Sequence, residues 1–413
     1  MQAEKLPPKT FSRRVRPSYP VVKQRPVKVP RRVKTQNAKV ILSKLKYKNI
    51  LILVALLMTV SWVISLPFRG RPVSETSIST PESSLSPTLV PPYVSPVPEQ
   101  PLEDLGFAYN VRKEPYKRFS SQLQEVVNEL VNIVTEKGLP TESLSISLID
   151  VSNQDVHTFA GYQNQVLRYP ASVAKLFWMA AFYGAVEQGL IDDESKFHED
   201  LKLMMQKSHN DSAGIILDAI TNTKSGDELA GEKLNTWLEK RKSVNDFFQK
   251  AGYQGLIVST KNYPIYSPSQ TGPVGRDRQL RQENGKFLSN LISTDHAIRL
   301  MYEIYTRQAV SQKYSTRMAY LLTRDLRPGA LPDDTDNIKG FLGESLPPNI
   351  YFGSKVGLTT KHRMEVAFVR TLDDKAIYIL AIFGEDAAYH NDQEIFPQLS
   401  RYVYDRMIAM TNN

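Results

Sequence analysis

The sequence predicts an α/β domain in which an antiparallel sheet is flanked by terminal helices and interrupted by an inserted all-helical lobe. Segments that alternate apolar and polar residues lie near both ends of residues 105–413, whereas the residues between them have helical spacing. Strands on either side of a helical middle indicate one sheet with helices packed on it and a separate helical lobe. An uncharged apolar run earlier in the chain predicts a single transmembrane helix before this domain.

Residues 1–49 are predicted to be a disordered basic tail in the cytoplasm. They contain 15 lysines and arginines, a single acidic residue, Glu4, and few large apolar residues to form a core. We interpret their charge as a topology signal, with attraction to anionic lipid heads as a further effect. The whole chain has a net charge of +9, so the remaining residues are mildly acidic and do not indicate nucleic-acid binding.

Residues 50–66, ILILVALLMTVSWVISL, predict an uncleaved signal anchor at the short end of the range for a membrane-spanning helix. A cleavable signal peptide is the alternative, but the leader is long and PFRG follows the run instead of a small-x-small site. Lysines directly before the run place the N-terminus in the cytoplasm and the later domain in the periplasm or outside the cell. Residues 67–104, rich in proline and serine, predict a semi-rigid linker.

The elements of the domain follow one another in a regular order. We expect a helix over residues 119–137, strands over 144–150 and 156–162, and a long helix over 170–188. Further helices are expected to about residue 323. The last predicted elements are strands over 350–353, 365–371 and 376–383 and an amphipathic helix over 392–410.

Cysteine and histidine usage limits the possible chemistry. The chain has no cysteine, which excludes disulfides, thiolate nucleophiles and cysteine-ligated metals. Its six histidines show no pair at a ligand spacing. We therefore expect neither a metal nor a cofactor.

The helix over residues 170–188 has Ser172 in its first turn and Lys175 three residues later, so both side chains lie on one face. The free N–H groups at a helix start favour an oxyanion beside Ser172. A buried lysine loses its proton easily, and Lys175 can then act as a base toward the serine hydroxyl. The spacing alone is a weak signal, because Ser43 and Lys46 repeat it in the basic tail.

Two further clusters lie later in the chain. Ser208-His209-Asn210 stands where an apolar run gives way to a helix start, which suits a proton relay and an amide contact, or an ordinary helix cap. Lys355-Val356-Gly357 lies on a predicted strand, where the glycine allows a ligand to approach the backbone. A lysine on an edge strand is the alternative interpretation of this cluster.

In this order the three clusters resemble the S-x-x-K, S-D-N and K-T-G signature of the serine β-lactamase and penicillin-binding protein superfamily. The similarity is closest to class A β-lactamase-like serine hydrolases and covers about 300 residues from near Phe119 to the C-terminus. It implies a β-lactamase/transpeptidase-like fold and an acyl-enzyme mechanism. It also implies a small-molecule or peptide substrate, namely a β-lactam, an ester or a cell-wall peptide.

The resemblance assigns three catalytic roles. Ser172 is implied as the nucleophile, Lys175 as its general base and Ser208 as the relay of a proton to the leaving group.

It also assigns five substrate-binding positions. Asn210 would position the substrate and Lys355 would add positive charge, while Gly357 leaves room beside the strand. The N–H group of Leu358, with that of the nucleophile, would form the oxyanion hole. Arg363 would bind a substrate carboxylate.

The sequence departs from the family pattern in three places. His209 replaces the Asp of the second motif, and Val356 replaces a Thr or Ser of the third. No E-x-x-L-N pattern, which holds the deacylating glutamate of class A enzymes, lies between the second motif and residue 293. Asp277 and Glu283 are the acidic residues in the corresponding region. These departures favour an acyl-enzyme serine hydrolase over a true class A β-lactamase, with a weak penicillin-binding or scaffold module as a further alternative.

Overall fold

The computed structural model describes residues 91–92, 107–115, 117–153, 155–285, 287–329 and 335–411. The predicted tail (1–49), the anchor (50–66) and nearly all of the linker (67–104) lie outside these ranges. Among the described helices, none is long and apolar enough to cross a membrane.

A seven-stranded sheet forms the centre of the domain, with the strand order β1-β3-β2-β9-β8-β7-β6. Its long strands match the alternating segments of the sequence, and β7–β8 and β8–β9 are hairpins in continuous antiparallel register. The strands of this sheet are β1 (Arg118–Phe119), β2 (Leu144–Asp150), β3 (Thr158–Tyr162), β6 (Thr323–Arg324), β7 (Ile350–Thr359), β8 (His362–Thr371) and β9 (Ile377–Gly384).

Two features of the fold differ from the prediction. The sheet is mixed, because β1 pairs in parallel with β3, whereas the other neighbours are antiparallel. The inserted lobe also contains a hairpin of β4 (Ile265–Tyr266) and β5 (Ser269–Gln270), so it is not all-helical. Both exceptions involve strands of two residues, which are too short to show an alternating pattern.

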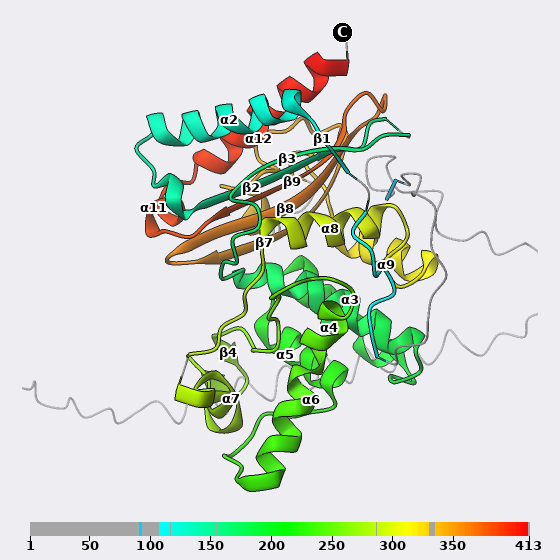
Figure 1. Ribbon diagram of the computed structural model, residues 1–413, viewed down its shortest axis with the longest axis vertical. Coiled ribbons are helices and arrows are strands. Elements are labelled where there is room, and N and C mark those ends of the chain that lie inside the picture. The colour runs from blue at the N-terminus through cyan, green and yellow to red at the C-terminus, as the bar shows by residue number, and fades with distance from the viewer. Residues whose placement is uncertain are drawn as a thin grey trace, which may run out of the picture. The chain divides into compact units, whose positions relative to one another are not determined.

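One face of the sheet is covered by the terminal helices α2 (Ser121–Glu136) and α12 (Ile395–Thr411), as Figure 1 shows. Ser120 caps α2 by accepting a hydrogen bond from the N–H of Leu123 at 3.2 Å. Apolar residues at helical spacing on α2 and α12 pack with those at alternate positions of β2 and β9 in one core. These two helices confirm the predicted terminal layer.

The other face carries α8 (Thr294–Tyr305), which packs on β2, β8 and β9 (Figure 1). Beyond it lies the helical lobe, centred on α3 (Ala174–Glu187), which contacts α4, α5, α6 and α9. Nearly all of α3 is buried, as its apolar sequence predicts. The remaining helices are α4 (His198–Gln206), α5 (Asn210–Thr221), α6 (Gly231–Gln249), α7 (Gly275–Arg281), α9 (Gln312–Leu322), α10 (Thr335–Ile338) and α11 (Ala387–Asn391), with 3₁₀ turns η3 (Thr141–Ser143), η4 (Ala171–Val173), η5 (Glu194–Phe197) and η6 (Glu283–Gly285).

Candidate active site

Ser172 lies in the 3₁₀ turn η4, directly before α3. The residue before it, Ala171, has a left-handed backbone with φ of 47°. A left-handed conformation is unfavourable for a residue with a side chain, and such strain is found where a functional group must be held in one position. The turn leaves Ser172 half-buried at the edge of a pocket, whereas its two neighbours are buried.

Lys175, in the first turn of α3, is fully buried, and its Nζ lies 2.9 Å from Ser172 Oγ. Lys175 Nζ also donates hydrogen bonds to the carbonyl oxygen of Ser208, at 2.5 Å, and to Asn210 Oδ1, at 2.7 Å. Burial lowers the pKa of Lys175 from 10.5 to about 7. A neutral amine has two N–H groups for the two carbonyl oxygens and one lone pair for the serine hydroxyl, so this geometry suits a base.

Ser208 lies in the short connection between α4 and α5, again in a left-handed conformation with φ of 55°. Its hydroxyl accepts a hydrogen bond from Lys355 Nζ at 2.7 Å. His209 caps α5, because its ring nitrogen accepts from the N–H of Ser212. The cluster is therefore both a helix cap, at the histidine, and a set of pocket side chains, at Ser208 and Asn210.

Lys355 extends from β7 and is fully buried, and its Nζ also donates to the Val356 carbonyl at 2.9 Å. Burial is the main cause that lowers the pKa of Lys355 well below its usual value, and the charges of Lys175 and Arg324 lower it further. Ser208 thus lies between two buried lysines. Its carbonyl oxygen accepts a hydrogen bond from Lys175, and its hydroxyl accepts one from Lys355.

Gly357 brings β7 against the nucleophile turn. A Cβ at this position would lie 2.6 Å from the Pro170 carbonyl oxygen and 3.0 Å from the backbone nitrogen of Ser172. The absence of a side chain therefore allows the strand to pass within contact distance of the amide predicted to stabilise the oxyanion. The next residue, Leu358, lines the pocket and is 45% exposed.

Comparison with known protein families identifies this constellation. A family model described as the beta-lactamase enzyme family matches residues 122–407. The chain belongs to the beta-lactamase enzyme family. This membership confirms the resemblance drawn from the three motifs, and the protein is a serine hydrolase of that family.

Solved structures similar to this family member include β-lactamases and a penicillin-binding protein. A β-lactamase from Sphaerobacter thermophilus is 17% identical over 68% of this chain and 96% of its own, with a TM-score of 0.45. A variant of PBP-A, solved as an acyl-enzyme with penicillin G, is 16% identical over 72% of this chain and 100% of its own, with a TM-score of 0.48. A β-lactamase from Xanthomonas campestris is 12% identical over 68% and 98%, with a TM-score of 0.46. A comparison with curated protein sequences gave no match.

The pocket of this beta-lactamase family member has a volume of about 290 Å³ and contains Ser172, Ser208, Asn210 and Leu358 among its lining residues. Several lining residues were not predicted, because no local pattern marks them: Tyr169, Lys207, Asn262, Tyr263, Pro264, Asn337 and Phe341. Asn262 is the most informative, since its Nδ2 donates to the Ala171 carbonyl at 3.0 Å and so supports the strained turn.

The structure places Arg363 outside this pocket, against the prediction that it binds a substrate carboxylate. Its side chain is buried, and its three nitrogens donate to the carbonyl oxygens of Tyr389, Gly340 and His390 at 2.7–2.8 Å. These bonds tie β8 to the segment before β7 and to α11. Arg363 therefore has a structural position, and the sequence pattern missed it because the two sides of a strand were not distinguished.

Neither acidic candidate for deacylation lines the pocket. Asp277, on α7, is buried with Oδ1 3.9 Å from Arg241 Nη2, and Glu283 forms an ion pair with Lys242. Among the described residues that line the pocket, there is no aspartate or glutamate. The lining of the described pocket therefore offers hydroxyl groups and one lysine, Lys207, but no carboxylate base.

Proposed function

We propose that this family member is a membrane-anchored serine hydrolase that forms an acyl-enzyme through Ser172 and acts on an amide or ester of the β-lactam or cell-wall peptide class. The observation that supports this proposal most strongly is the contact between Lys175 Nζ and Ser172 Oγ at 2.9 Å in a buried setting. A base this close, with a pKa of about 7, is matched to taking the serine proton at neutral pH.

Acylation would proceed in two steps. The Ser172 hydroxyl gives its proton to neutral Lys175 while Oγ attacks the substrate carbonyl carbon, and the N–H groups of Ser172 and Leu358 receive the oxyanion. The tetrahedral intermediate then collapses and the bond to the leaving nitrogen or oxygen breaks. The Ser208 hydroxyl relays to the leaving group the proton that Lys175 took from Ser172, so that Ser208 and Lys175 both return to their starting protonation states. Lys355, which donates to the same hydroxyl, stabilises negative charge on its oxygen during the transfer.

Deacylation of a β-lactam adduct should be slow. Hydrolysis of the acyl-enzyme needs a base for water, and losing a positioned base typically lowers a rate by about 10²–10⁴-fold. The described pocket residues include no carboxylate for that role. This absence favours a penicillin-binding enzyme over an efficient class A β-lactamase, whereas the intact serine–lysine contact argues against a scaffold module.

This chain should also bind a substrate carboxylate more weakly than family members that have a Thr or Ser at the position of Val356. Val356 supplies no hydroxyl, and a hydrogen bond to a charged group contributes on the order of 1.5–3 kcal/mol. The Thr359 hydroxyl lines the pocket and lies 2.6 Å from His362 Nδ1, so it can donate to a substrate carboxylate when the histidine ring nitrogen is the donor in that contact.

Intact-mass analysis after exposure to a reactive penicillin tests the proposal, with Ser172→Ala as the control. We expect a one-to-one adduct on the wild-type protein that persists for many minutes, and none on the variant. Rapid turnover without an adduct would indicate a true β-lactamase. An unreacted protein would indicate the binding or scaffold alternative.

We also propose that residues 50–66 anchor the enzyme, with residues 1–49 in the cytoplasm and residues 105–413 in the periplasm or outside the cell. The uncharged run and its basic flank support this topology. Protease added to intact spheroplasts should remove the catalytic domain, and protection of that domain would contradict the topology.

A further inference from the structure

A second cavity lies in the helical lobe, apart from the active-site pocket. Its volume is about 1010 Å³, and it shares no lining residue with the active-site pocket. It is formed by the C-terminal half of α5, the connection between α5 and α6, the first half of α6 and the start of α7. Neither the family signature nor the proposed reaction uses any of these residues.

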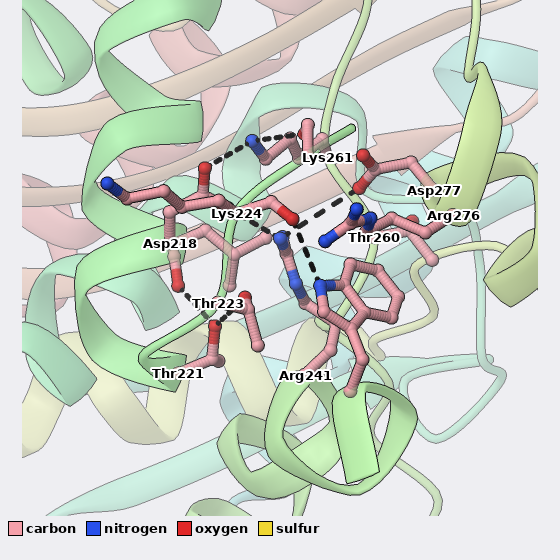
Figure 2. Close-up of polar contacts among 12 residues, drawn as sticks. Asp218, Thr221, Thr223, Lys224, Arg241, Thr260, Lys261, Arg276 and Asp277 are labelled. Atoms are coloured by element: carbon pink, nitrogen blue, oxygen red, sulfur yellow. Dashed lines mark hydrogen bonds and ion pairs between the residues drawn. The ribbon is translucent and has the colours of Figure 1, made fainter. Parts of the chain in front are cut away.

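One wall of the cavity holds an electrically balanced cluster, drawn in Figure 2. Asp218 accepts a hydrogen bond from Arg241 Nη2 at 2.5 Å and another from Lys261 Nζ at 2.7 Å. Both cations are buried, and Asp277 provides a second carboxylate 3.9 Å from Arg241 Nη2. Because two cations meet two carboxylates, Asp218 does not give this wall a net negative charge.

A second group of lining residues is mostly cationic. Lys224, Lys233, Lys240 and Arg276 line the cavity, against one further carboxylate, that of Glu232. The three lysines are exposed and have no acidic partner among the described residues, whereas Arg276 donates through Nε to the Asp227 carbonyl at 3.0 Å. The cavity therefore has a surplus of positive charge.

Apolar surface makes up the other walls. Ile215 is 47% exposed, and it lines the cavity with Phe197, Leu229 and Trp237. The indole N–H of Trp237 already donates to the Lys224 carbonyl at 3.0 Å. Its ring needs no further polar partner and can offer apolar contact to a ligand.

We propose that this cavity binds a small organic anion with an aromatic or short apolar body and a phosphate, sulfonate or carboxylate group. The lysines would receive the anionic group, and Ile215, Leu229 and Trp237 would cover the apolar body. An inorganic anion would leave the apolar walls in water, and a neutral apolar molecule would leave the lysines unpaired. A cavity that has both lysines and apolar walls therefore favours an amphipathic anion.

Calorimetric titration of the full chain in nonionic detergent tests the proposal, with 1-naphthyl phosphate as the probe. We expect one site per chain, and at least tenfold weaker binding of both inorganic phosphate and 1-naphthol. The double variant Lys233→Glu/Lys240→Glu should weaken binding of 1-naphthyl phosphate at least tenfold. Lys250→Glu is the control, since it makes the charge change of one of these two substitutions, on an exposed lysine at the other end of α6, and it should alter affinity less than twofold.

The proposal would be overturned by the absence of saturable binding of 1-naphthyl phosphate, by equal binding of inorganic phosphate, or by a double variant that binds like the wild type. Equal weakening by Lys250→Glu would also overturn it, because the effect would then reflect overall charge. Thermal unfolding of each variant checks that it is folded. Trp237→Phe provides a second, apolar probe of the site and should weaken 1-naphthyl phosphate several-fold while leaving inorganic phosphate unchanged.

Discussion

The titration of Lys175 gives a prediction that can be worked out quantitatively. Burial lowers its pKa from 10.5 to about 7, which corresponds to on the order of 5 kcal/mol against the charged amine. At pH 7.5 about three quarters of such lysines are neutral, compared with roughly one in a thousand at the usual pKa. Burial therefore raises the concentration of the active base by about 10²–10³-fold at this pH.

The rate constant for acylation should follow the neutral form of Lys175, because only that form accepts the Ser172 proton. We expect the rate with a fluorescent penicillin to rise about tenfold per pH unit below pH 7 and to level off above it. Labelling of the full chain, separated on denaturing gels at intervals between pH 5 and pH 9, measures this profile. Lys175→Ala should abolish labelling at every pH, and circular dichroism at each pH checks the fold.

A flat profile between pH 5 and pH 8 in a folded wild-type protein would refute this reasoning. A rate that still rises about tenfold per pH unit up to pH 9 would refute it too, because it would mean that burial leaves the lysine near its ordinary pKa. Sustained labelling of Lys175→Ala would show that another group takes the serine proton.

Three substitutions test other parts of the site. Ser208→Ala removes the hydroxyl that Lys355 Nζ contacts at 2.7 Å, and should slow penicillin labelling by about 10²–10⁴-fold without changing the melting temperature much. Gly357→Ala places a methyl group 2.6 Å from the Pro170 carbonyl oxygen; we expect slower labelling and a loss of about 1–3 kcal/mol in denaturant unfolding. Arg363→Met removes the donors of three carbonyl groups, so the free energy of unfolding should fall by on the order of 3 kcal/mol while the KM for a carboxylate-bearing substrate stays unchanged.

The parts of the fold that the sequence predicted are those with a regular period. The strand over residues 144–150 has the predicted bounds, and the buried helix that follows the nucleophile turn was recognisable from its apolar run. The pair Ser172 and Lys175 was also predictable, because a spacing of three on a helix fixes both side chains on one face whatever the rest of the fold does.

The missed features depend on contacts between distant parts of the chain. Arg363 lies on the correct strand, but only the packing of that strand decides that its side chain meets Gly340 and Tyr389 instead of the pocket. Asn262 lies in an irregular segment where no period links it to the Ala171 carbonyl that it contacts. Loop positions of this kind follow from tertiary packing, which a local pattern does not contain.

The two buried lysines also affect how the fold responds to pH and to mutation. An unfolded lysine with a pKa of 10.5 holds its proton across the range in which folded Lys175 has lost it, so stability should rise between pH 7 and pH 10.5 and be lowest below pH 7. Lys355 adds to this effect in the same direction. Replacing either lysine with methionine should therefore make the domain harder to unfold and leave it inactive. The active site is thus a place where this enzyme gives up stability for reactivity, and selection for stability alone would remove the residues that catalysis needs.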